Sequence, residues 1–245
     1  MTWVLDLDGV VWRGDQPIAG SADAVARLRK SGERVVVVTN NSALTLADYE
    51  AKLARCGVPT DPADIVTSAQ VAAGMVEAGA RVLVVGGEGV REALRGRGID
   101  VVDDGPAEVV MVGWTREFDY QHLTIAMRAV RAGARLIGTN DDATYPTPEG
   151  VLPGGGSLVA AVAYASGVDA TFAGKPYPPM VDAVRTRFGP VDVMVGDRPS
   201  TDGLLARGLG ARFALVMSGV TTDADLPVDP TPDLVAADLA GLVAQ

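Results

Sequence analysis

The chain has 245 residues, 48% of them hydrophobic, and a formal net charge of −10 at pH 7. This length and apolar content can bury one large core or two modest ones, while the acidic balance, without a cluster of lysines or arginines, argues against a nucleic-acid partner. The first residues contain no basic segment followed by a long apolar run, so we predict a cytoplasmic protein with no membrane partner.

Strand-like apolar runs alternate with amphipathic, helix-like segments along the whole chain, which is the pattern of an α/β fold with parallel sheets covered by helices. In chain order, the predicted strands are 3–7, 34–39, 81–85, 109–112, 135–138, 191–195 and 212–216. The predicted helices are 22–30, 46–55, 90–97, 121–132, 158–166, 179–187 and 202–208. Only the stretch 223–232, rich in Asp and Pro, is expected to be an irregular loop before a short final helix.

The first predicted strand ends in a segment with two carboxylates, Asp6 and Asp8. Open α/β sheets bind their ligands at the carboxyl ends of the strands, and Gly9 permits an immediate turn that can aim both side chains into one pocket. An Asp-x-Asp sequence that only caps a turn is the alternative interpretation, and this segment by itself does not exclude it.

Three further segments at or near strand ends carry complementary groups. Thr39 and Asn40 offer a hydroxyl, an amide and backbone N–H groups, which can hold phosphate oxygens. Lys175 is a cation between a glycine and a proline, and Asp197 and Asp202 follow the strand predicted at 191–195. Together with the first acidic pair, these groups indicate a phosphate site with an acidic centre.

Four segments resemble the motifs of the haloacid dehalogenase (HAD) superfamily, and in particular of its class IIA, NagD-like phosphatases. They are DLDGVVWRG at 6–14, TNNS at 39–42, TSA at 67–69 and GD followed by TD within 196–202. The resemblance covers nearly the whole chain. It implies a doubly wound parallel-sheet core and an inserted α/β cap of the C2a type. The members of this class include 4-nitrophenyl, phosphoglycolate and glycerol phosphatases.

The resemblance implies a magnesium-dependent phosphatase that works through a phospho-aspartyl intermediate. Asp6 is then the nucleophile, and Asp8 protonates the leaving alcohol and later deprotonates water. The Mg²⁺ ligands would be the Asp6 and Asp197 carboxylates and the Asp8 backbone carbonyl. Dehalogenase relatives lack the second aspartate of the first motif, so the presence of Asp8 favours phosphoryl chemistry.

By the same resemblance, Thr39, Asn40 and Lys175 bind the transferring phosphoryl group. Lys175 would also neutralise charge on the nucleophile. Asp202 would either contact the metal ligands without binding the metal itself or hold Lys175 in place. A solvated surface lysine would be the ordinary interpretation of Lys175 without this context.

A second domain fits only between the second and third motifs, because the segment between Asp8 and Thr39 has room for no more than a flap and one helix. We predict a core formed by 1–74 and 171–245 and a cap formed by 75–170. A cap over the strand ends would enclose the phosphate and exclude water.

Substrate contacts are expected from the cap and from the flap. The candidates are Asn140 and Asp141 in a polar loop, Gly155 at a glycine-rich helix start, and Arg13 in the flap. Caps of this branch often mediate homodimers, so a homodimer through the cap is also expected.

Two other functions stay open at this point. A phosphotransferase or mutase would use the same aspartyl phosphate, and a catalytically silent protein would only bind a phosphorylated metabolite. The candidate substrates are small monoesters such as glycerol phosphate, phosphoglycolate, sugar phosphates and 4-nitrophenyl phosphate, and the sequence does not choose among them.

Overall fold

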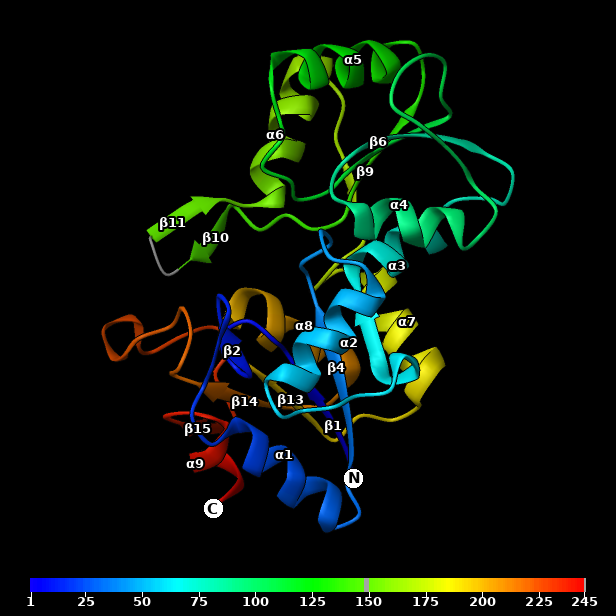
Figure 1. Ribbon diagram of the computed structural model, residues 1–245. Coiled ribbons are helices and arrows are strands. Elements are labelled where there is room, and N and C mark those ends of the chain that lie inside the picture. The colour runs from blue at the N-terminus through cyan, green and yellow to red at the C-terminus, as the bar shows by residue number, and fades with distance from the viewer. Residues whose placement is uncertain (148–149, 245) are drawn as a thin grey trace.

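The computed structural model describes residues 1–147 and 150–244, which form two α/β layers stacked one above the other (Figure 1). The lower layer holds a parallel six-stranded sheet in the order β15-β14-β13-β1-β4-β5. Its strands are β1 Thr2–Leu5, β4 Arg34–Thr39, β5 Ile65–Thr67, β13 Val193–Gly196, β14 Arg212–Val216 and β15 Leu234–Ala236.

Helices cover both faces of this sheet. One face carries α1 Ser21–Lys30, α2 Leu46–Arg55 and α9 Leu239–Val243, and the other carries α3 Ser68–Gly74, α7 Pro178–Phe188 and α8 Leu204–Leu209. Along β4, Val35 and Val37 pack on the face covered by α1, α2 and α9, while Val36 and Val38 pack on the face covered by α3, α7 and α8. The reason is that successive side chains of a strand point to opposite faces of the sheet. Each buried valine contributes roughly 1.5–3 kcal/mol.

The upper layer is built on a parallel five-stranded sheet in the order β12-β9-β8-β6-β7. Its strands are β6 Arg81–Val85, β7 Asp100–Val102, β8 Val109–Val112, β9 Arg135–Gly138 and β12 Thr171–Phe172. One face packs against α5 Tyr120–Arg131 and α6 Gly155–Ser166, and the other packs against α4 Glu88–Arg95. The prediction assigned 171–172 to the core, whereas these residues pair with β9 in this sheet.

The two layers share apolar packing. The core cluster that includes α3, α7 and α8 continues through α4 into the five-stranded sheet, where it contains Val82 and Met111. At the junction, a Cβ added to Gly89 of α4 would lie 2.0 Å from the Leu44 carbonyl oxygen, so only glycine permits this approach.

Two short antiparallel hairpins complete the fold. One is β2 Trp12–Arg13 with β3 Gln16–Pro17, and the other is β10 Thr144–Thr147 with β11 Gly150–Pro153. The second hairpin projects from the upper layer beside the junction of the two layers (Figure 1). Short helical turns lie at η1 Pro62–Asp64, η2 Pro199–Gly203 and η3 Asp223–Asp225.

The predicted α/β fold is confirmed, and the seven predicted strands all form with boundaries within two residues. The helix predicted from Asp202 is wrong at its start, because Asp202 lies in the π-helical turn η2 and α8 begins at Leu204. Among residues 1–147 and 150–244, no helix combines the length and apolar composition needed to cross a membrane.

Candidate active site

The candidate site lies where β1, β4 and β13 end side by side. Asp6 follows β1, Thr39 is the last residue of β4, and Asp197 follows β13. The backbone N–H of Asp6 still donates to the Val195 carbonyl at 2.9 Å, which holds the nucleophile candidate against the neighbouring strand. Gly9 turns the chain away with a φ of +84°, and a Cβ there would lie 2.5 Å from Asp197 Oδ2.

A buried lysine links two of the carboxylates. Lys175 Nζ donates to Asp6 Oδ1 and to Asp202 Oδ1, at 2.7 Å each, and the Lys175 and Asp202 side chains are 2% and 0% exposed. Burial alone would lower the pKa of Lys175, but Asp202 and Asp6 together raise it above its ordinary value. Of the two roles expected for Asp202, the structure shows the contact with Lys175.

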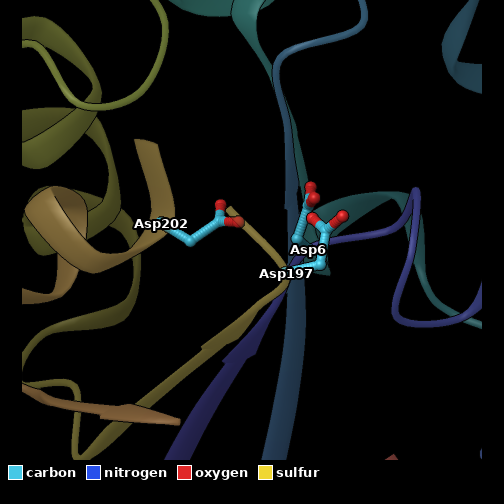
Figure 2. A group of neighbouring side chains, drawn as sticks. All are labelled: Asp6, Asp197 and Asp202. Carbon is cyan, nitrogen blue, oxygen red and sulfur yellow. The ribbon is translucent and has the colours of Figure 1, made fainter. Parts of the chain in front are cut away.

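Three carboxylates converge at this point. Ligand oxygens of Asp6, Asp197 and Asp202 lie within 4.8 Å of one another. Figure 2 shows the Asp6 and Asp197 carboxylates side by side, with Asp202 pointing toward them from the opposite side. Burial raises the pKa of Asp6 well above its ordinary value, and burial together with Asp202 raises the pKa of Asp197 to about 7. A divalent cation bound among these carboxylates would stabilise their ionised forms, which burial and mutual repulsion otherwise disfavour.

The hydrogen bonds indicate which oxygens could hold that cation. Asp202 accepts from Lys175 with one oxygen and from the Arg198 N–H with the other, at 3.1 Å. Asp6 accepts from Lys175 with Oδ1 only, and Asp197 accepts from the Val220 N–H with Oδ2 only, at 2.6 Å. Within the described residues, each of these two aspartates therefore keeps one carboxylate oxygen free of hydrogen bonds, and the donor set fits Mg²⁺.

Asp8 is held by the first hairpin. The Trp12 indole N–H donates to Asp8 Oδ1 at 3.1 Å, and Lys52 Nζ lies 4.4 Å from the centroid of a Trp12 ring. Burial raises the pKa of Asp8, although Lys52 and the Trp12 hydrogen bond partly oppose the shift. A carboxyl group with a raised pKa is suited to giving and taking protons near neutral pH.

Thr39 and Asn40 of the second motif both line the cavity, and Asn40 also connects the two layers. Thr39 Oγ1 accepts from the Asn41 N–H at 3.1 Å, and the Thr39 hydroxyl is also within hydrogen-bonding reach of the buried Tyr49 side chain. The Asn40 amide donates to Asp142 Oδ2 at 3.0 Å and to the Lys175 carbonyl at 3.1 Å, and Asn40 Oδ1 accepts from the Lys175 N–H at 2.7 Å. The Asn40 side chain thus holds Lys175 and the loop that carries Asp142 in place.

These groups line one cavity together with residues of the upper layer. The lining residues are Asp6, Asp8, Thr39, Asn40, Asn41, Trp114, Asn140, Asp142, Thr144, Tyr145, Pro146, Gly154, Gly155, Lys175, Asp197, Arg198, Thr201 and Val220. The cavity therefore joins the predicted catalytic residues to the predicted cap.

Of the four predicted substrate contacts, the cavity contains Asn140 and Gly155 but not Arg13 or Asp141. Asn140 donates to the Asn40 carbonyl at 2.7 Å. Arg13 donates to the Ser218 carbonyl, and Asp141 accepts from the Tyr177 hydroxyl. Both of these side chains are engaged outside the cavity.

The sequence interpretation gave no site role to the lining residues Trp114 and Arg198, and it included Asp142 and Tyr145 only as part of a polar loop in the expected cap. Trp114 comes shortly after β8, much as Asp6 and Asp197 follow β1 and β13, so the strand-end rule could have found it. Asp142 and Arg198 form an ion pair at 3.6 Å between distant segments, and no sequence spacing indicates it.

Comparison with known proteins gives a consistent picture. A sequence profile described as haloacid dehalogenase-like hydrolase matches residues 3–100, and a related HAD-hydrolase-like profile matches residues 172–242. The chain is 36% identical to the D-glycerol 3-phosphate phosphatase of Mycobacterium tuberculosis, with 98% of this chain and 70% of that protein aligned. It is 34% identical to the dihydroxyacetone phosphatase of Corynebacterium glutamicum, with 98% and 90% aligned.

The solved structures that resemble this chain include further phosphatases. The 4-nitrophenylphosphatase of Thermotoga maritima superposes with a TM-score of 0.91 at 31% identity, covering 100% of this chain and 96% of that one. The glycerol phosphate phosphatase of Mycobacterium tuberculosis, crystallised in complex with magnesium, superposes with a TM-score of 0.90 at 34% identity, covering 98% and 75%. The same enzyme has also been crystallised in complex with calcium.

Proposed function

The chain belongs to the haloacid dehalogenase-like hydrolases and is a phosphatase of phosphate monoesters, and we propose that it acts on small metabolites with Mg²⁺ and a phospho-aspartyl intermediate on Asp6. The observation that carries this proposal is the placement of Asp6 in the cavity between Lys175 and Asp197, with Asp8 lining the same cavity. One nucleophile, one proton donor and two charge-neutralising partners then serve a single phosphoryl group.

In the first step, an Asp6 oxygen attacks phosphorus, the ester P–O bond breaks, and Asp8 gives its proton to the leaving oxygen. In the second step, water attacks the acyl phosphate, Asp8 takes the proton of that water, and inorganic phosphate leaves Asp6 as a carboxylate. Trp12 holds Asp8 in place for both proton transfers through its indole N–H.

The phosphoryl oxygens need positive partners throughout both steps. The Thr39 hydroxyl can donate to one of them, and Lys175 brings a buried cation that already touches Asp6. Mg²⁺, held by Asp6, Asp197 and the Asp8 carbonyl, would supply charge neutralisation between the carboxylates and the phosphate dianion. Asp202 keeps Lys175 aimed at Asp6.

We also propose that the two layers are a catalytic core and a specificity cap. The six-stranded sheet supplies the catalytic residues, and the five-stranded sheet, with the hairpin β10–β11, covers the cavity. Because β12 pairs with β9, the cap is better bounded at 75–172 than at the predicted 75–170.

A homodimer through the cap remains a prediction. It draws support from the exposed aromatic side chains of Tyr164 on α6 and Tyr120 on α5, which are 94% and 84% exposed. Analytical ultracentrifugation of the purified chain measures it directly, and a monomer at micromolar concentration would refute it.

The test of the proposed function is phosphate release from a panel of small monoesters that includes 4-nitrophenyl phosphate. Activity should disappear in EDTA and return with Mg²⁺, and full activity in metal-free protein would exclude this mechanism. Adding a simple alcohol as acceptor tests the transferase alternative, because a transferase yields a new phosphate ester while a phosphatase yields only inorganic phosphate.

A further inference from the structure

The part of the cavity contributed by the upper layer has an aromatic wall. The rings of Trp114 and Tyr145 lie 4.7 Å apart, and Pro146 continues the wall. The polar atoms of this wall are already engaged, because Trp114 Nε1 donates to the Pro153 carbonyl at 3.0 Å and the Tyr145 hydroxyl accepts from Asn41 Nδ2 at 3.4 Å. A substrate therefore meets aromatic carbon and one phenolic O–H here.

Acidic side chains outnumber basic side chains around the cavity. Four aspartates line it, namely Asp6, Asp8, Asp142 and Asp197. Among the described lining residues the only cations are Lys175 and Arg198. Apart from the proposed Mg²⁺, which would serve the reacting phosphate, the site thus holds more carboxylates than cationic side chains.

Both cations are paired. Lys175 bonds to Asp6 and Asp202, so it serves the reacting phosphoryl group. Arg198 Nη1 lies 3.6 Å from Asp142 Oδ1, while Asp142 Oδ2 accepts from Asn40. No lining cation of the described chain is therefore free to pair with a second anionic group on a substrate.

Two other arginines lie near the cavity without lining it. Arg13 donates to the Ser218 and Gly219 carbonyls. The exposed Arg116 guanidinium lies 5.9 Å from the centroid of a Trp114 ring. Neither side chain is among those that form the cavity.

We propose that this cavity selects phosphate monoesters whose leaving group is uncharged, such as a polyol, a sugar or a phenol, and discriminates against those that carry a carboxylate or a second phosphate. The proposal rests on the proposed function and narrows its substrate class. An anion enclosed here would lose water without gaining a cationic side-chain partner and would face the Asp142 carboxylate.

The experiment compares kcat/KM for matched substrates that differ in one charge. One pair is 2-hydroxyethyl phosphate and phosphoglycolate, and the other is glycerol 3-phosphate and 3-phosphoglycerate. We expect the wild-type protein to favour the neutral member of each pair at least about tenfold, which corresponds to about 1.4 kcal/mol.

A variant with an added cation tests the cause of this preference. Thr144 lines the cavity and its side chain is exposed, so Thr144→Lys places a positive charge at the wall without breaking the Asp142–Arg198 pair. It should reduce the preference for neutral substrates about tenfold. Thr144→Gln is the matched control, since it adds bulk and polarity without charge, and it should change the preference less than about twofold.

The outcomes separate the two proposals. A wild-type protein that hydrolyses no monoester refutes the proposed function itself. A wild-type protein that hydrolyses both members of each pair equally well refutes only the selection by charge. If Arg116→Gln then shows a preference for the neutral substrates, Arg116 supplies the free cation that the proposal denies. An unchanged preference in a folded Thr144→Lys protein also overturns the proposal. If that variant does not fold, as judged by its circular dichroism melt, the two wild-type ratios decide.

Discussion

Replacing Lys175 with methionine tests the ion-pair network at the centre of the site. Methionine is similar in length and apolar, so the main loss is the charge that stands between Asp6 and Asp202. Removing one partner from a buried ion pair costs about 3–5 kcal/mol, because it leaves a buried charge uncompensated. In a chain of this size, about 2–4 °C of melting temperature corresponds to each kcal/mol, so the melting temperature should fall by about 6–20 °C.

The loss should depend on pH with a definite sign. Burial already raises the pKa of Asp6, and Lys175 opposes that shift, so the variant should have an even higher folded-state pKa for this carboxyl. A raised folded pKa gives stability that is present below the unfolded value near 4 and is lost as the pH rises through the folded value. The deficit of Lys175→Met should therefore be larger at pH 8 than at pH 5.

Thermal melts of the metal-free protein, followed by circular dichroism, measure both effects. Lys30→Met, on an exposed helix end, is the matched control and should change stability by no more than about 0.5 kcal/mol. Adding Asp202→Asn to Lys175→Met should recover about 1–3 kcal/mol, because one of two facing carboxylates is then neutral. A Lys175→Met protein as stable as the wild type at pH 8 would refute the reasoning.

Two further predictions concern the acid groups. Asp8→Asn should lower kcat by about 10²- to 10⁴-fold, and by less for 4-nitrophenyl phosphate than for an alkyl phosphate, because the phenol leaves without help; an equal loss for both would argue against Asp8 as the acid. In metal-free protein, the pKa of Asp197 is raised to about 7, so stability from this group is present below about pH 4 and is lost as the pH rises through 7. The melting temperature of the wild-type protein should thus fall by about 5 °C or more between pH 5 and pH 8, and that of Asp197→Asn should fall less. The same fall of melting temperature with pH in both proteins would contradict the raised pKa of Asp197.

Sequence patterns predicted the long buried strands well, because runs such as the one ending at Thr39 are apolar on both faces and end in polar residues. Shorter elements were missed. The strand β5 has only three residues, and the helix α3 that follows it was noted only as a Thr-Ser-Ala motif, although Thr67 and Gln70 form a capping box that marks its start.

The site divides in the same way. Residues at strand ends, such as Asp6 and Asp197, could be placed together from the topology of parallel sheets. The contacts made by the upper layer could not be placed in this way, because they depend on how the two layers meet. Asp141 and Asp142 are neighbours in one loop, yet only Asp142 reaches Asn40 and Arg198 while Asp141 bonds to Tyr177. A polar loop indicates that contacts exist but not which side chain makes them.

The central claim is that Asp6 carries the phosphoryl group during turnover, and chemical trapping of the acyl phosphate tests it most directly. Enzyme mixed with Mg²⁺ and substrate is quenched in acid and reduced with borohydride, which converts a phosphorylated aspartate to homoserine, and the peptides are then mapped by mass spectrometry. The account predicts homoserine at position 6 alone, and none in Asp6→Asn. Modification at another aspartate, or normal turnover by Asp6→Asn, would contradict it.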